Sequence, residues 1–183
     1  GVLVQEAQKE IFVIKEEIVV EDGHKWAKLS PSKSAIFEFE IDFAHPIIKK
    51  QKYSFDFSTR AYQEEIAKAR TFGFLKEVQY LRSIGLAQGG SLDNAIVLDD
   101  KKVLNQEGLR YKDEFVRHKI LDAIGDLFLA RKPIFGKYSS FAGSHKLNYM
   151  LISKLLETHS AYDVITSSEA KKEYRTLYAK SFA

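Results

Sequence analysis

The sequence predicts an α+β fold in which a β-sheet is layered against packed helices. Three observations point to this class. Before residue 58, apolar and polar residues alternate with the period of β-strands, whereas after it apolar residues recur mainly at helical spacing. Two short apolar segments, 95–98 and 162–166, return to strand character. Neither a GxGxxG fingerprint nor a P-loop motif is present, so a doubly wound nucleotide-binding sheet is not indicated.

The composition indicates one globular domain. The chain has 183 residues, of which 45% are hydrophobic, and this suffices for a single core. Its 28 basic and 25 acidic residues are interspersed, so no nucleic-acid surface is predicted. The absence of cysteine excludes disulfides and thiolate metal sites. No apolar run resembles a transmembrane segment or a signal peptide, so we expect a cytoplasmic protein.

The first third of the chain is predicted to be β-structure. Residues 11–20 are rich in β-branched side chains and indicate a first strand, which ends at a turn over 21–23. Residues 26–29 are expected to return as the second arm of a hairpin. In 35–43, Phe and Ile alternate with Glu and Asp, which is typical of a half-buried strand. Segment 52–58 alternates in the same way. Its inward side chains are predicted to be Tyr53, Phe55 and Phe57.

Two helices are predicted to follow these strands. Ser58 or Thr59 can cap a helix over 62–69, because a hydroxyl can accept a hydrogen bond from a free backbone N–H of the first turn. Apolar residues at helical spacing predict a second helix over 74–84, and Gly85 is suited to end it.

A short β-hairpin and the longest helix come next. The strand at 95–98 is expected to pair with a short strand near 102–104. The longest helix is predicted over 112–130. Pro133, Gly136 and Gly143 then indicate an irregular segment.

The C-terminal part is predicted to contain two more helices and one strand. Ser144 can cap a helix that runs over 146–157. Residues 162–166 indicate a last strand, and the charged segment 167–180 indicates a terminal helix.

The long helix carries a polar stripe that has two interpretations. Asp122 and Asp126 lie about 40° and 80° from His118 around the helix axis, opposite the apolar face. The structural interpretation is a solvated helix face. The chemical interpretation is that an imidazole and a carboxylate one turn apart bind zinc, which would also need a third ligand. Gly125 lies beside His118 and predicts close approach of another group, because glycine costs about 1 kcal/mol relative to alanine in a helix.

His145 also has two interpretations. If Ser144 caps the helix, His145 lies in the first turn, where the helix dipole disfavours a protonated imidazole. The carboxylate of Asp126 could restore the charged form near neutral pH. Alternatively, His145 only begins a helix at the surface.

Several motifs resemble a known family. They are VEDGHKWA (20–27), ARTFGF (69–74), GGSLDNAIV (89–97), LNQEGLRYKDEFVRHKILDAIGDL (104–127) and GSHKLN (143–148). In this order they resemble UDP-3-O-acyl-N-acetylglucosamine deacetylase, the zinc-dependent enzyme of lipid A synthesis in Gram-negative bacteria. The resemblance implies a hydrolase that removes acetate from a UDP-linked, 3-O-acylated glucosamine, the committed step toward lipopolysaccharide.

The resemblance also implies roles for individual residues. His118 and Asp122 would be ligands of a zinc ion (Zn²⁺), although iron could compete for such a site. Asp126 would orient His145, which would serve as general acid or support the oxyanion. The hydroxyl of Thr71 would stabilise the tetrahedral intermediate.

Substrate contacts are implied in the same way. Lys119 would reach sugar or phosphate oxygens, Phe72 would pack against the substrate, and Gly90 would also contact it. The fatty acyl chain would occupy an apolar passage, although periodicity alone is equally compatible with core packing. The residues at the passage positions are Phe74, Val78, Ala87, Ser91, Ala95 and Val97.

The family has two similar domains, packed with their helices between two sheets, and this chain resembles only the second half of that sheet/helix/sheet sandwich. Residues 1–10 would be the end of the first domain or a linker, and 11–183 the catalytic second domain. The chain does not begin with methionine, which suggests a longer polypeptide. The absent first domain would supply a third histidine ligand and a glutamate base. We therefore expect weak zinc binding and no turnover from this chain alone. The alternative is a noncatalytic module that binds the acyl chain and the sugar nucleotide.

Overall fold

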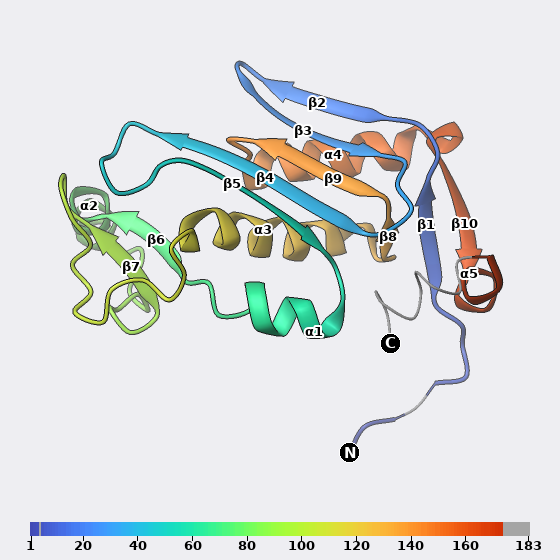
Figure 1. Ribbon diagram of the computed structural model, residues 1–183, viewed down its shortest axis with the longest axis horizontal. Coiled ribbons are helices and arrows are strands. Elements are labelled where there is room, and N and C mark those ends of the chain that lie inside the picture. The colour runs from blue at the N-terminus through green and yellow to red at the C-terminus, as the bar shows by residue number, and fades with distance from the viewer. Residues whose placement is uncertain (4, 174–183) are drawn as a thin grey trace.

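The largest element of the fold is a five-stranded sheet with the strand order β2-β3-β9-β4-β5 (Figure 1). The computed structural model describes residues 1–3 and 5–173. Neighbouring strands are antiparallel except β4 and β9, which are parallel. The strands are β2 (Ile18–Asp22), β3 (Lys25–Ser30), β4 (Ile36–Phe43), β5 (Lys49–Asp56) and β9 (Lys137–Phe141).

Two helices cover one face of this sheet. Helix α3 (Glu114–Leu127) packs on β4 and β5, and α4 (His145–Glu157) packs on β2 and β3 and against α3 (Figure 1). The side chains between the two layers form the core, and each large apolar one stabilises the fold by about 1.5–3 kcal/mol. Fully buried members include Leu29, Phe39, Ile41, Phe55, Phe115, Ile120, Leu147 and Leu151.

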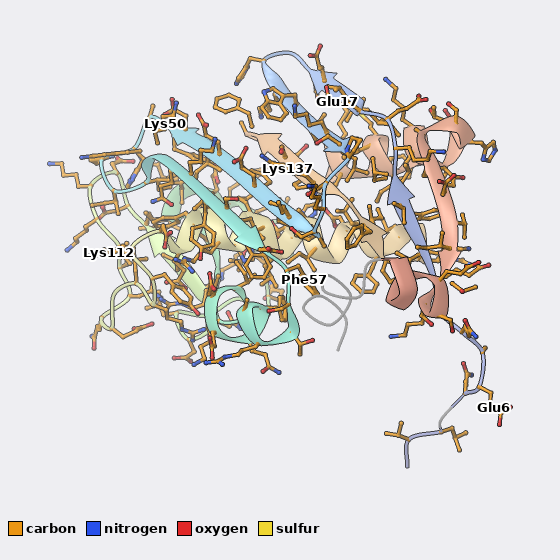
Figure 2. The ribbon with its side chains drawn as sticks, turned by 45° about the vertical axis from the view of Figure 1, so that its right-hand side comes forward. Glu6, Glu17, Lys50, Phe57, Lys112 and Lys137 are labelled. Carbon is orange, nitrogen blue, oxygen red and sulfur yellow. The ribbon has the colours of Figure 1, made fainter. Side chains whose placement is uncertain are left out.

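The opposite face of the sheet carries charged side chains. Glu40 lies 2.7 Å from the Nζ of Lys50, and Glu38 lies 3.4 Å from the Nζ of Lys137. Figure 2 shows Lys50 and Lys137 on the strands of this sheet. The alternation expected for 35–43 is therefore confirmed, with Glu38 and Glu40 on one face and buried Phe39 on the other.

Two smaller sheets flank the central one. At one end, β1 (Glu10–Ile14) pairs antiparallel with β10 (Tyr162–Thr166) and parallel with β8 (Ile134–Phe135). At the other end, β6 (Thr71–Phe74) and β7 (Ala95–Leu98) are parallel and are joined through α2 (Leu75–Ser83). The remaining helical turns are α1 (Thr59–Ala61), η1 (Tyr62–Ile66), η2 (Phe128–Ala130), η3 (His159–Ala161) and α5 (Ser167–Glu173).

Most of the predicted elements are confirmed. The hairpin of β2 and β3, helix α4 with its Ser144 cap, and strands β7 and β10 lie where expected, and α3 continues into η2. Ser58 caps α1, and the helical segment ends at Ile66, earlier than predicted. Near 102–104 only one bridge forms, from Leu98 to Val103. The second helix begins at Leu75, since Phe74 ends β6. Residues 174–180 of the predicted terminal helix lie outside the described residues.

The single strand predicted over 11–20 is wrong. It is two strands, β1 and β2, which belong to different sheets. The backbone N–H groups of Lys15 and Glu16 both donate to the carbonyl of Ala161, so the ladder is interrupted there. The β-branched composition predicted the strands correctly, but the change of sheet depends on this tertiary contact.

The irregular segment predicted up to Gly143 is also wrong. It contains β8 and β9, and β9 is the central strand of the five-stranded sheet. Glycines flank this strand and have low strand propensity, but Ser139 and Ser140 between them are buried and paired on both sides, and this pairing overrides the local signal.

Gly136, between β8 and β9, is predicted to tolerate no side chain. A Cβ there would lie 2.7 Å from Ile14 Cγ1 and 3.0 Å from the carbonyl oxygen of Ser30. Gly136→Ala should therefore lower the free energy of unfolding by about 1–3 kcal/mol, measured by urea denaturation. Gly125→Ala is the matched control. A Cβ at Gly125 would meet nothing within 4 Å, so the change should stabilise α3 by up to about 1 kcal/mol. Equal destabilisation by both changes would contradict this prediction.

Candidate metal and acid–base site

His118 and Asp122 face each other one turn apart on α3. The Nε2 of His118 lies 3.3 Å from Asp122 Oδ1. The Nδ1 of His118 lies 3.3 Å from the carbonyl oxygen of Ala69, to which it can donate only when protonated. With the proton on Nδ1, the lone pair of Nε2 is directed toward the carboxylate. Both side chains are half-buried.

The charge state of His118 suits metal binding. Burial lowers the pKa of the imidazole, and this effect outweighs the opposing effects of Asp122 and of the hydrogen bond to Ala69. His145 and Lys119 lower the pKa further. His118 is therefore neutral near pH 7, which is the form that coordinates metals.

A second aspartate and histidine form a pair nearby. The Nδ1 of His145 lies 2.7 Å from Asp126 Oδ2, so it donates a hydrogen bond to the carboxylate. Asp126 comes from the last turn of α3, and His145 from the first turn of α4. The side chain of His145 is 69% exposed, which leaves its Nε2 accessible to a ligand. The sequence prediction that Asp126 pairs with His145 is compatible with this geometry.

The side chains expected to contact substrate surround the first pair. The Nζ of Lys119 lies 2.9 Å from Asp122 Oδ2. The ring of Phe72 packs edge-on against His118, with a centroid distance of 6.2 Å, and also against Phe115. Thr71 is exposed in β6, two residues after Ala69. The close approach of another group that we expected at Gly125 is not found among the described residues, since a Cβ there would meet nothing within 4 Å.

One face of the β6–β7 sheet carries Thr71 together with small and apolar residues. Thr71 pairs with Ala95 and Gly73 pairs with Val97, and alternation places these four on one face. Val78 of α2 lies over this face, because a Cβ on Gly73 would be 3.2 Å from Val78 Cγ2. Because Gly73 and Ala95 are small, side chains cover this face only in part.

Other residues predicted for the acyl passage lie beside this face or opposite it. Ala87 and Ser91 are exposed in the loop after α2, where Gly90 accepts a hydrogen bond from Arg82. Phe74 lies on the opposite face and contacts the rings of Phe43 and His45.

An ion pair that the sequence analysis missed fixes the start of α3. Glu114 is 0% exposed and accepts hydrogen bonds from the backbone N and Nε of Arg70, at 3.0 and 2.9 Å. The backbone N–H of Arg110 also donates to it, at 2.5 Å. Glu114 lies one turn before His118, on the same polar stripe of α3. This spacing is the sequence signal that could have identified Glu114 as part of the site.

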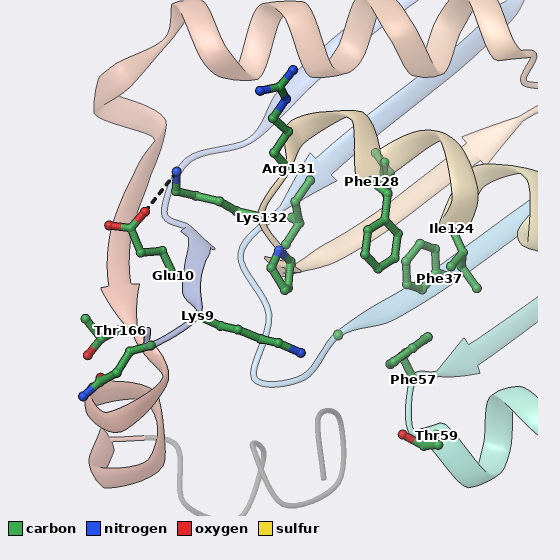
Figure 3. A pocket seen from close by; sticks show the side chains of 15 residues that line it. Lys9, Glu10, Phe37, Phe57, Thr59, Ile124, Phe128, Arg131, Lys132 and Thr166 are labelled. Atoms are coloured by element: carbon green, nitrogen blue, oxygen red, sulfur yellow. Dashed lines mark ion pairs between the residues drawn. The ribbon is translucent and has the colours of Figure 1, made fainter. Parts of the chain in front are cut away.

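A cavity lies at the other end of α3. Its volume is about 680 Å³, and it lies between β1, the start of β4 and the C-terminal turns of α3. Figure 3 shows the rings of Phe37, Phe57 and Phe128 with the side chain of Arg131 around it. None of the residues of the two aspartate–histidine pairs lines this cavity. The volume of a cavity therefore does not identify the candidate site in this protein.

The donors of His118 and Asp122 fit a metal only in part. Imidazole nitrogen and carboxylate oxygen are both zinc ligands, but a protein zinc site needs at least three donors. Within residues 1–3 and 5–173, no group of three or more His, Asp or Glu side chains is arranged to hold a metal. A complete site would need a donor from outside this part of the chain.

The imidazole–carboxylate pair supplies two types of zinc ligand, and the second aspartate–histidine pair supplies an acid–base group; metal-dependent hydrolases combine these two functions. Comparison with known proteins identifies the family. Residues 1–157 match the family model for UDP-3-O-acyl N-acetylglycosamine deacetylase. The chain belongs to this family.

Curated relatives are similar over nearly the whole chain. UDP-3-O-acyl-N-acetylglucosamine deacetylase of Nitratiruptor sp. is 58% identical over 94% of the chain. Those of Helicobacter hepaticus and Helicobacter pylori are 55% and 52% identical over 98% and 100% of it. The matches cover 58%, 60% and 61% of these relatives, so the chain spans about three fifths of their length. None of the described helices combines the length and hydropathy needed to span a bilayer.

The Arg70–Glu114 pair is predicted to stabilise the fold strongly. Glu114→Ala should lower the free energy of unfolding by about 3 kcal/mol, because the buried Arg70 guanidinium loses its buried carboxylate and keeps Glu107, which is 55% exposed, as its counter-charge. Thermal or urea unfolding measures this change. Glu64→Gln, which affects an exposed pair with Arg60, should leave the free energy of unfolding nearly unchanged.

The pH dependence of stability gives a second readout of the same prediction. Burial raises the pKa of Glu114, but hydrogen bonds from Arg70 and Arg110 outweigh burial, so the pKa lies below its usual value. The stabilisation is then complete above the unfolded-state pKa of about 4.3 and is lost as the pH falls through the folded-state pKa. Glu114→Gln should reduce this loss on acidification. An unchanged acid limb would contradict the prediction.

Proposed function

We propose that this chain is the catalytic second domain of a zinc-dependent hydrolase that removes acetate from UDP-3-O-acyl-N-acetylglucosamine, the committed step of lipid A synthesis. The observation that carries the proposal is the pairing of His118 with Asp122 and of Asp126 with His145 on two adjacent helices. The activity in the names of the curated relatives agrees with it. A cytoplasmic location remains a prediction.

The proposal includes a first domain upstream of this chain. Residues 1–10 would connect to it and 11–183 would form the second domain. Large apolar side chains of the helical elements, such as Leu129 of η2 and Tyr149 of α4, are exposed. Such an apolar surface suits a covering partner, and this supports a sandwich in which helices of both domains lie between their sheets. That domain would add a histidine ligand and a glutamate base.

His118 and Asp122 would hold the zinc ion through Nε2 and a carboxylate oxygen. When bound, zinc lowers the pKa of a coordinated water to about 7 and polarises the amide carbonyl. Iron could occupy the same donors. The hydrogen bond from His118 to Ala69 would keep the coordinating nitrogen free.

The remaining side chains would act directly on the substrate. His145 holds Nδ1–H on Asp126, so its exposed Nε2 would deliver a proton to the departing amine or support the oxyanion. The Thr71 hydroxyl would donate a hydrogen bond to the developing oxyanion. Lys119, which contacts Asp122 here, would bind sugar or phosphate oxygens once the carboxylate is engaged by metal.

The acyl chain would lie along the face of β6 and β7 that carries Thr71. Ala95 and Val97 would form its floor and Val78 one wall, with Ala87 and Ser91 at the exposed loop. Phe72, whose ring contacts His118, would pack against the sugar end of the substrate, and Gly90 would also contact the substrate. Phe74, on the opposite face, would support the floor from beneath.

The second candidate function is a noncatalytic module that binds the acyl chain and sugar nucleotide. It is favoured by one observation, the lack of a three-donor metal group among the described residues. The upstream sequence separates the two candidates, because a histidine and a glutamate of the kind described would complete the enzyme.

Metal content and turnover of the full-length protein test the proposed function. His118→Ala and Asp122→Ala should each lose zinc and activity, because each removes a ligand. Asp126→Asn should keep zinc but lower kcat by about 10²-fold, since His145 loses its charged partner. Metal analysis and acetate release measure these effects.

The isolated chain serves as the control for this experiment. We expect it to bind zinc weakly and to release no acetate. Turnover by this chain alone, or full zinc content in His118→Ala, would overturn the assignment. Unchanged kcat in Asp126→Asn would remove the role of the Asp126–His145 pair.

The acyl passage is predicted to respond to a single bulky side chain. Val97→Phe should lower kcat/KM for long-chain substrates by about tenfold, and less for short-chain ones, because added volume in a packed site costs about 1–3 kcal/mol. Val164→Phe, at an exposed position on β10, is the matched control. Equal losses for all chain lengths would contradict the placement of the acyl chain.

A further inference from the structure

Asp126 has a second hydrogen-bond partner besides His145. We infer that Asn148, held by Tyr138, is a positioning residue that fixes the Asp126 carboxylate and thereby the orientation of His145. The inference deepens the proposed function and rests on it, because it concerns the same acid–base group. Asn148 and Tyr138 would not touch the substrate.

A chain of hydrogen bonds runs from the sheet to the candidate site. The Tyr138 hydroxyl, on the central strand β9, donates to Asn148 Oδ1 at 2.7 Å. Asn148 Nδ2 donates to Asp126 Oδ2 at 2.8 Å, and the same oxygen accepts the bond from His145 at 2.7 Å. One oxygen of Asp126 is thus held by two donors, both from the first turns of α4.

Hydrogen-bond chemistry determines the direction of every link. An ionised carboxylate only accepts, so Asn148 must present its amide N–H₂ to Asp126 and its carbonyl to Tyr138. The phenol must then donate. Burial raises the pKa of Tyr138, which keeps its hydroxyl protonated. At the other end, His145 must carry a proton on Nδ1, and its Nε2 is left for the reaction.

The burial of Asn148 and Tyr138 favours a role for this hydrogen-bond chain beyond packing. Asn148 is 2% exposed and Tyr138 is 1% exposed. An apolar pair of similar shape could fill the same space at little or no cost in stability, since a buried hydrogen bond contributes little net free energy. Leucine at position 148 and phenylalanine at position 138 would fill this space but could not hold the Asp126 carboxylate by a hydrogen bond, as Asn148 does.

The position of His145 makes this support necessary. Its side chain is 69% exposed, and the bond to Asp126 is the constraint that the structure gives to its ring. If the carboxylate turned away from Asn148, the ring could rotate or adopt the Nε2–H tautomer. Nε2 would then be unable to accept the proton that it must later deliver.

The test uses the full-length, zinc-loaded protein with the variants Tyr138→Phe, Asn148→Leu and their combination. Each single change leaves one buried polar group unpaired, whereas the double variant removes both, so it remains foldable if a single variant is unstable. Ser139→Ala is the matched control, because the Ser139 hydroxyl is buried on β9 and has no hydrogen-bond partner in the described part of the chain. Measurements are kcat, KM, metal content, and the ¹⁵N shifts of His145, which report its tautomer.

Asn148→Leu is expected to lower kcat about tenfold with KM and zinc content unchanged, and to move neutral His145 toward the Nε2–H tautomer. Tyr138→Phe should lower kcat in the wild-type background but not in the Asn148→Leu background, because it acts only through Asn148. Ser139→Ala should change none of these quantities.

An Asn148→Leu protein with the wild-type kcat and tautomer would overturn the inference, as would independent, multiplying effects of the two changes. Failure of the proposed function is distinguishable from this result. If the wild-type protein releases no acetate, the function is wrong, whereas the tautomer of His145 in wild type and in Asn148→Leu still decides whether Asn148 positions the ring.

Discussion

The placement of α3 is the constraint on which the rest of the structure depends. The helix carries Glu114, His118, Asp122 and Asp126 at successive turns, so any rotation or sliding would displace all four. Its apolar face is held by the central sheet, and its first turn is held by the buried Arg70–Glu114 pair. The same pair brings the chain before β6 against α3, which places the Ala69 carbonyl beside His118. Packing and one internal charge pair thus set the geometry of the candidate site.

The two aspartate–histidine pairs use the same residue types in different environments. His118 is enclosed, and burial lowers its pKa, which favours a neutral ligand. His145 is mostly exposed and hydrogen-bonded to Asp126, an arrangement that favours proton exchange with a substrate. In the proposed function, solvent access rather than residue identity would therefore separate the metal-binding histidine from the acid–base histidine. The first pair lies on α3, and the second joins α3 to α4. The packing of these two helices fixes the positions of all four side chains.

The fold is a two-layer structure with unequal surfaces. The outer face of the sheet is covered by paired charges such as Glu40 and Lys50, which suits contact with water. The helical elements expose aromatic and aliphatic side chains such as Tyr149 and Leu129. The chain spans about three fifths of the length of its relatives, and its described residues hold no three-donor metal group. In the proposed function, the first domain would cover the helix side.

The sequence by itself determined the α+β class, most helices and strands, and the stripe of His118, Asp122 and Asp126, because periodicity and helix caps are local properties. It also carried the motifs that place the chain in its family. The tertiary structure alone decided that residues 11–20 divide between two sheets and that serine-rich β9 lies at the centre of one. It likewise decided that Arg70 pairs with Glu114 and Tyr138 with Asn148. Such contacts join residues far apart along the chain or on separate elements, and their free energy comes from pairing and burial that no local pattern encodes.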